Sequence, residues 1–220
     1  LGNNGLLGDG DIQWMTAGSG IIHQEMPKGN NKGEMHGFQL WANLPSNQKM
    51  TAPRYQDIKS KEIKSLFDDD GTIIKVIAGN YRGYNGPVDG IAAEPEYLDI
   101  YIPPLKFKKF PFDTRRQGFA YIFEGEGNFN NASKPVGVKV EKEFQGQEIE
   151  LRDLSGNRTL VVFDSGDEVA VQAGENGVRF LLISGTPIKE PVAWHGPIVM
   201  NSQEELRQAF NELNNGTFIK

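Results

Sequence analysis

Residues 8–27 read GDGDIQWMTAGSGIIHQEMP and hold His23, one of three histidines in the chain, two positions before Glu25. Side chains at positions i and i+2 of a strand point to the same face of a sheet. Apolar, β-branched neighbours predict a strand over 21–23, so we expect His23 and Glu25 to face a barrel interior together. Imidazole nitrogen with carboxylate oxygen suits iron, manganese, nickel or zinc, but two ligands alone are too few to hold such an ion tightly.

The composition narrows the class of protein. The chain has 220 residues, 23 basic and 29 acidic side chains, a net charge of −6 and no cysteine. This acidic balance gives no electrostatic basis for direct nucleic-acid binding, and no apolar run approaches the roughly 20 residues of a membrane span. The absence of cysteine excludes a disulfide framework. With no visible targeting segment, we expect a cytoplasmic location, or a nuclear one if the source is eukaryotic.

Short apolar runs bounded by glycine and proline predict many strands, which is typical of an all-β sandwich or barrel. Helical spacing predicts two helices, over 57–67 and 202–213, the second with Ser202 and Glu205 as a capping box. The polar residues 45–70 are interpreted as a linker between two β units. The predicted strands are 11–15, 21–23, 38–44, 72–78, 97–102, 119–123, 136–140, 159–163, 168–171 and 178–183.

Four stretches resemble the pirin family of the cupin superfamily, in the same order across essentially the whole chain. They are residues 8–27, HGFQLWANLP (36–45), KMTAPRYQDI (49–58) and PVAWHGPIVMNSQEEL (191–206). The resemblance implies a bicupin, in which two cupin-type antiparallel β-barrels pack together with a C-terminal helix.

We divide the chain on this basis. Residues 1–58 form the C-terminal part of the metal-binding barrel with the start of a linker, so the first barrel is incomplete in this chain. Residues 59–187 form the second barrel, which we expect to be metal-free because no histidine occurs between His36 and His195. Residues 188–220 form a Pro-rich arm and the terminal helix.

The resemblance also implies one mononuclear metal, usually iron as Fe(II), held by three histidines and one glutamate. His23 and Glu25 map onto one half of that ligand set. The other half, a His-x-His segment, would precede Leu1, so we expect upstream residues to be missing and the site to be incomplete here. Other divalent transition metals suit the same ligand types.

Three functions follow from the resemblance. The first is a quercetin 2,3-dioxygenase, which opens the central ring of a flavonol with O2 and releases carbon monoxide; here Glu25 is the candidate catalytic base and His23 a metal anchor. The second is a non-enzymatic, iron- and redox-dependent regulatory partner of a transcription factor or metabolic enzyme. The third is a metal-free form with neither activity.

The sequence also suggests roles for residues outside the predicted metal pair. We expect His36 to be structural and His195 to form an inter-domain hydrogen bond, while Gln39 and Trp41 line either a pocket floor or a barrel core. The acidic pair at 124 and 126 is expected on a solvated glycine turn. The run PPLKFKKFPF (103–112) interleaves lysine with phenylalanine. We interpret it as an edge strand protected by lysine, rather than a single-stranded nucleic-acid site or a protein-partner patch.

Overall fold

The structure is a computed structural model that describes residues 5–129, 136–138, 154–164 and 166–219. The chain divides into two compact units, which we describe separately. Unit 1 comprises residues 1–13 and 57–187, and unit 2 comprises residues 14–56 and 188–220. The sequence-based division at residues 58 and 187 stays a prediction.

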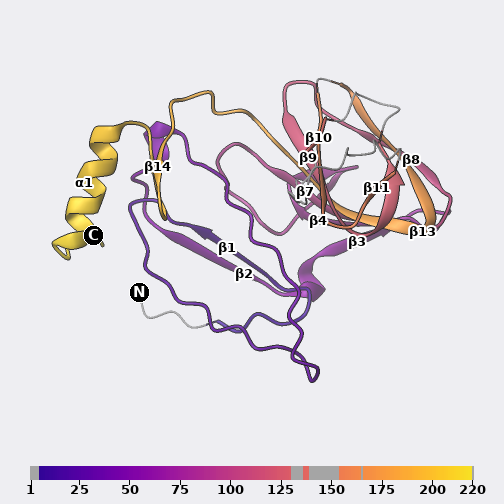
Figure 1. Cartoon of the computed structure of the whole chain (residues 1–220), viewed down its shortest axis with the longest axis horizontal. Helices are drawn as coiled ribbons and strands as arrows, with labels where there is room; N and C mark the ends of the chain where they lie inside the picture. The colour runs from indigo at the N-terminus through magenta and orange to yellow at the C-terminus, as the bar shows by residue number, and fades with distance from the viewer. Residues whose placement is uncertain (1–4, 130–135, 139–153, 165, 220) are drawn as a thin grey trace, which may run out of the picture. The chain divides into compact units, whose positions relative to one another are not determined.

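A nine-stranded antiparallel sheet dominates unit 1 (Figure 1). Its main path runs β10-β12-β9-β13-β7-β4-β3, with β11 paired to β9 and β8 paired to β13. The short strands β5 (Asn80–Tyr81) and β6 (Tyr84–Asn85) form a separate hairpin. The members of the large sheet are β3 (Lys64–Phe67), β4 (Ile73–Ala78), β7 (Glu96–Ile102), β8 (Phe107–Pro111), β9 (Gln117–Asn128), β10 (Val136–Val138), β11 (Ser155–Gly156), β12 (Thr159–Val162) and β13 (Glu168–Gly185).

The longest strand, β13, has 18 residues and joins two runs that the sequence separated, 168–171 and 178–183. Its register against β9 shifts between Ala173 and Val178, which is a bulge rather than an end. Two glycines with positive φ, Gly125 and Gly177, meet there. A Cβ on Gly125 would lie 2.1 Å from the carbonyl oxygen of Gly177, so only glycine fits. Pairing with β9 resumes at Val178, so the strand continues beyond residues that look like a turn.

The same bulge corrects the predicted acidic turn. Glu124 and Glu126 lie inside β9 rather than on a loop, because Gly125 absorbs the irregularity without ending the strand. The Glu124 side chain is exposed, as expected, and its carboxylate lies 3.9 Å from the guanidinium of Arg179. Glu126 is half-buried.

The helix predicted over 57–67 is wrong. The chain instead forms β2 (Arg54–Ile58), a 3-10 turn (Ser60–Glu62) and β3, whose residues pair with β4 from Lys64 opposite Val76 to Phe67 opposite Ile73. Strand pairing outweighs the weak helical spacing of this short segment. Residues 45–70 are therefore more than a linker, because they supply a strand of the large sheet.

The strands predicted over 21–23 and 38–44 are also wrong, since neither segment lies in a strand. Apolar alternation supplies no partner for backbone N–H and C=O groups, and a strand exists only where another strand supplies one. Large apolar side chains in these segments are exposed to solvent: Ile22 is 73% exposed and Trp41 is 59% exposed. The strand predicted over 11–15 is present as β1 (Ile12–Thr16), which pairs with β2.

The terminal helix is confirmed as α1 (Gln203–Asn214), with the predicted capping box. The backbone N–H of Glu205 donates to the Ser202 hydroxyl at 3.2 Å, and the N–H of Ser202 donates to the Glu205 carboxylate at 2.8 Å. Leu206 and Ala209 pack against Ala193 and Ile198 of the hairpin formed by β14 (Ala193–His195) and β15 (Ile198–Met200).

A buried lysine organises another part of unit 2. Lys49, which is 6% exposed and follows a 3-10 turn (Ser46–Gln48), donates from Nζ to the Asn43 side-chain oxygen at 2.7 Å and to the Leu44 carbonyl at 2.9 Å. Burial lowers the pKa of Lys49, and the carboxylates of Glu190 and Glu205 oppose that shift. Glu190 also accepts hydrogen bonds from Ser46. This network ties residues 43–49 to the C-terminal arm.

In unit 1, ion pairs connect β8 to the turn between β3 and β4. The Lys108 ammonium lies 2.8 Å from Asp68 and 2.9 Å from Asp70, and Asp68 also pairs with Arg82 at 2.8 Å. The N–H of Thr72 donates to Asp70 at 3.0 Å. Partial burial raises the pKa of Asp70, but the hydrogen bonds from Thr72 and Lys108 outweigh it and lower this pKa to about 2.

We expect Asp70 to make unit 1 sensitive to acid. Because its folded-state pKa lies below the unfolded value of about 3.9, its stabilisation is complete above that pH and is lost as the pH falls through about 2. Asp70→Asn should flatten the loss of urea stability between about pH 4 and pH 2, followed by far-UV circular dichroism. Asp69→Asn removes the same charge from the same turn and should keep the wild-type slope. Equal slopes for wild type and Asp70→Asn would contradict the assignment.

We expect Lys49→Met to destabilise unit 2 by about 2 kcal/mol, because it removes the ammonium that donates to the part-buried oxygens of Asn43 and Leu44. The three tryptophans of the chain all belong to unit 2, so tryptophan fluorescence during urea unfolding reports on it. Lys28→Met, on an exposed lysine, should change stability by less than about 0.5 kcal/mol. The role of the network is disproved if both variants unfold at the wild-type midpoint.

Candidate functional site

His23 and Glu25 lie side by side in unit 2, in a segment without regular secondary structure. The imidazole Nδ1 is 3.8 Å from a carboxylate oxygen of Glu25, and the side chains are 43% and 61% exposed. The expectation that they face a barrel interior is therefore wrong for the described chain, because the strand that would have aimed them inward is absent. Their proximity follows from sequence spacing alone.

The donor atoms of His23 and Glu25 suit a metal ion in type and separation. Two ligands that each bind one ion at about 2.1 Å can lie at most about 4.2 Å apart, and the observed separation of 3.8 Å is within that limit. Imidazole and carboxylate are also the ligand types of non-haem iron sites. Exposure leaves both groups accessible to an ion from solvent.

The pair supplies too few ligands to form a complete metal site by itself. Among the described residues, no group of three or more His, Cys, Asp or Glu side chains gathers closely enough to hold an ion. The ring of His36 packs edge-on against Phe38 at 5.1 Å, which agrees with a structural role. The ring of His195 packs edge-on against Phe210 at 5.4 Å, within unit 2. The described residues thus present part of a ligand set rather than a complete one.

Two residues expected near a pocket lie on the surface instead. Gln39 and Trp41 are both exposed, so neither lines a pocket floor or a barrel core in the described structure. The alternation that suggested these roles operates only inside a strand, and residues 38–44 are not one.

The interior of unit 1 is a packed apolar core, mostly aliphatic, that contains a cluster of phenylalanine rings. Phe110 and Phe180 are fully buried, and Phe129 is 2% exposed. Phe180 meets the other two rings edge-on, at 6.1 Å from Phe110 and 5.2 Å from Phe129, which is a favoured geometry for aromatic pairs. Residues 59–187 contain no histidine that could add an imidazole ligand.

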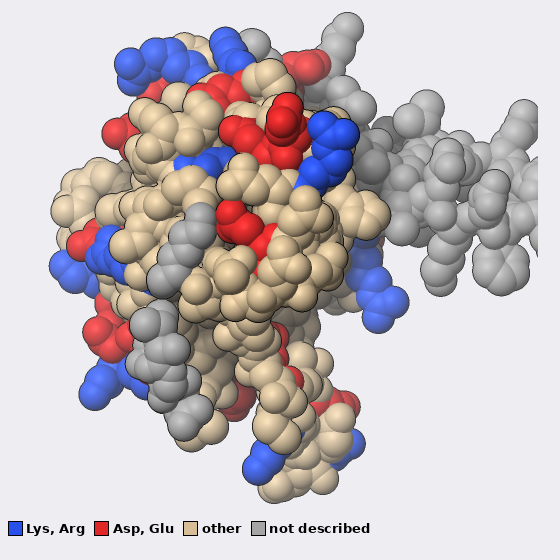
Figure 2. All heavy atoms as spheres, turned by 90° about the vertical axis from the view of Figure 1, so that its left-hand side faces the viewer, with Lys and Arg blue, Asp and Glu red and all other residues tan. Residues whose placement is uncertain are grey.

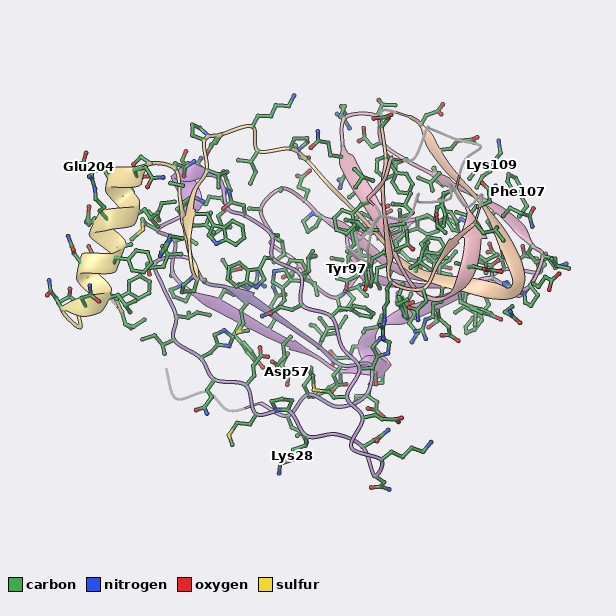
Figure 3. All side chains as sticks on the ribbon, in the orientation of Figure 1. Lys28, Asp57, Tyr97, Phe107, Lys109 and Glu204 are labelled. Atoms are coloured by element: carbon green, nitrogen blue, oxygen red, sulfur yellow. The ribbon has the colours of Figure 1, made fainter. Side chains whose placement is uncertain are left out.

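The basic–aromatic run forms an edge strand. Within the described part of the sheet, β8 pairs on one side only, with β13. Lys108 pairs with acidic groups of the β3–β4 turn, and Lys109 pairs with Glu168 at 2.7 Å. Phe107 and Lys109 lie at the outer surface of this strand (Figure 3). These ion pairs occupy two of the three lysines of the run.

Charges of both signs are interspersed over the face shown in Figure 2 rather than gathered into one basic field. A nucleic-acid-binding surface needs a continuous basic patch. The mixed charges on this face therefore agree with the acidic composition, which gives no basis for nucleic-acid binding. Among the described residues, no helix is long and apolar enough to cross a membrane.

The sequence analysis missed a surface groove of about 540 Å³ in unit 2, between β14 and α1. Trp194 and His195 line it on one side, and Arg207 and Phe210 on the other. The spacing of residues 203, 207 and 210–211 places them on one helix face and could have indicated one wall of the groove. We interpreted that spacing only as part of a docked helix.

The chain matches two family models. The model described as Pirin covers residues 1–42, and the model described as Pirin C-terminal cupin domain covers residues 97–219. The two matches follow the order of the motifs and together include both His23 and α1.

Relatives and solved structures agree. A pirin-like protein of Caulobacter vibrioides is 38% identical over 99% of this chain and 71% of its own length. Human pirin is 36% identical over 97% and 67%. A Thermoplasma acidophilum protein, whose name proposes a quercetin 2,3-dioxygenase, is 31% identical over 100% and 82%.

Among solved structures, a quercetin 2,3-dioxygenase from Acinetobacter baumannii superposes with a TM-score of 0.72 and 28% identity, over 95% of this chain and 67% of that one. The similarity therefore extends across both units and supports the cupin-type, mostly β fold with its terminal helix. This chain belongs to the pirin family of cupin proteins.

Proposed function

We propose that His23 and Glu25 are two ligands of a divalent transition metal, iron in the first instance, and that the protein acts as a quercetin 2,3-dioxygenase. This proposal rests on the imidazole of His23 and the carboxylate of Glu25, which lie 3.8 Å apart in a pirin-family chain. Support comes from relatives in Thermoplasma acidophilum and Pseudomonas aeruginosa, whose names propose this activity, and from the Acinetobacter baumannii enzyme of that name.

The proposed chemistry divides between the metal and the chain. When bound, the metal supplies a Lewis acid for the flavonol oxygens. The ionised Glu25 carboxylate accepts the proton of the flavonol hydroxyl, and its 61% exposure leaves it within reach of a substrate. His23 holds the ion through its imidazole. The overall reaction consumes one O2 and yields a ring-opened ester and carbon monoxide.

The test combines metal content with turnover. His23 and Glu25 alone are too few to hold iron tightly, so we expect elemental analysis, beside an intact mass of the same sample, to find iron in proportion to chain only where further ligands complete the site. A wild type without iron would overturn the metal proposal for this chain. His23→Ala should lower that content at least tenfold, since it removes a ligand. Glu25→Gln should lower aerobic flavonol loss and carbon monoxide release by about 100-fold or more, the usual range for a lost general base.

His36→Gln is the matched histidine control, because His36 lies in the same segment and its ring contacts Phe38. It should keep both metal content and turnover. Wild-type turnover in iron-loaded Glu25→Gln would overturn the base assignment, and unchanged metal content in His23→Ala would overturn the ligand assignment.

A second candidate is a regulatory module whose partner affinity follows the redox state of the metal. One observation favours it: large apolar side chains lie exposed over residues 22–50, including Ile22, Met26, Met35, Trp41 and Met50. Exposed apolar patches often mark protein contacts. A pull-down that recovers the same partner with equal affinity from Fe(II) and Fe(III) forms would exclude redox control and leave the enzyme as the better reading.

A further inference from the structure

An open surface groove lies between β14 and α1. Its volume of about 540 Å³ falls within the range of ligand pockets, roughly 300–1,000 Å³. All of its lining residues belong to unit 2, and it involves neither His23 nor Glu25. Any ligand bound there is therefore separate from the proposed metal chemistry.

One wall is a face of α1. Gln203, Arg207, Phe210 and Asn211 follow one another at the three- and four-residue spacing that places side chains on a common face. Their span of nine residues corresponds to a wall about 12 Å long. Between them, the buried Leu206 provides an apolar floor that packs against the hairpin core.

The other wall is aromatic and held in place. Trp194 is 67% exposed, and its indole N–H donates to the carbonyl of Gly196 at 2.8 Å. This bond satisfies the only polar atom of the ring, so the indole presents an apolar face to the groove. His195 packs edge-on against Phe210 and joins the two walls. A planar ring can stack on such a surface without displacing a hydrogen bond.

The groove contains one permanent cation. Arg207 has no ion-pair or hydrogen-bond partner among the described residues, whereas Arg82, Arg115 and Arg179 are all paired with aspartates. None of the side chains that line the groove is acidic. Two acidic residues precede Arg207 on the helix: Glu205 is engaged by Ser202, and the exposed Glu204, three residues before Arg207, forms no ion pair with it among the described residues. The guanidinium is thus free to receive a carboxylate in its bidentate geometry.

We propose that this groove binds a small planar aromatic carboxylate, with its ring against Trp194 and its carboxylate on Arg207. The shape, the aromatic wall and the unpaired guanidinium each match one part of such a ligand. Its length of about 12 Å suits a compound of one or two fused rings rather than a folded protein surface.

The test uses 2-naphthoate as probe and 2-naphthalenemethanol as its neutral analogue, titrated into the full chain. The readout is the indole N–H signal of Trp194 in ¹H–¹⁵N spectra, assigned among the three tryptophans by its loss in Trp194→Phe. We expect naphthoate to shift this signal saturably and to bind at least tenfold more tightly than the alcohol. Arg207→Gln should weaken naphthoate about tenfold and leave the alcohol unchanged.

Arg158→Gln is the matched charge control, since Arg158 is an exposed arginine of unit 1. It should keep wild-type affinity, and circular dichroism should show both arginine variants folded. Three results would overturn the proposal. They are an unmoved Trp194 signal, equal affinity for acid and alcohol, and equal weakening by Arg158→Gln and Arg207→Gln.

Discussion

Pairing of the long strand β13 with three neighbouring strands is the constraint on which the architecture of unit 1 depends. Residues 168–172 of this strand pair with β8, residues 172–173 and 178–185 pair with β9, and residues 178–184 pair with β7. A single backbone therefore joins three partners, and the buried side chains of one face of β13, Phe180 among them, enter one core. The strand can change partners only because Gly125 and Gly177 let the backbones approach at the bulge.

Unit 2 is organised by polar contacts and a small apolar cluster more than by a sheet. Lys49 holds residues 43 and 44, Glu190 holds Ser46, and the capping box fixes the start of α1. These contacts leave the segment of His23 and Glu25 exposed and without a strand ladder. The chemistry proposed for that pair thus depends on the identity and spacing of its donor atoms. The groove beside α1 depends instead on the tertiary packing of α1 against the hairpin.

The residues of the family motifs were sufficient to predict the mostly β fold, the terminal helix and its cap. These features depend on local patterns: the spacing of Ser202 and Glu205 decides a cap within one turn, and β-branched runs favour strands wherever they occur. Local patterns failed at 57–67, where pairing with β4 replaced a helix, and at 21–23 and 38–44, where no strand supplied a partner.

The sequence by itself determined family membership, the donor types at His23 and Glu25, and the absence of histidine from residues 59–187, because each depends only on which residues occur and how they are spaced. Only the tertiary structure decided that β13 is one bulged strand, that Lys49 is buried, and that Trp194 and Arg207 face one groove. Those facts depend on contacts between residues far apart in the chain. Periodicity within a segment carries no information about which distant backbone or side chain will meet it.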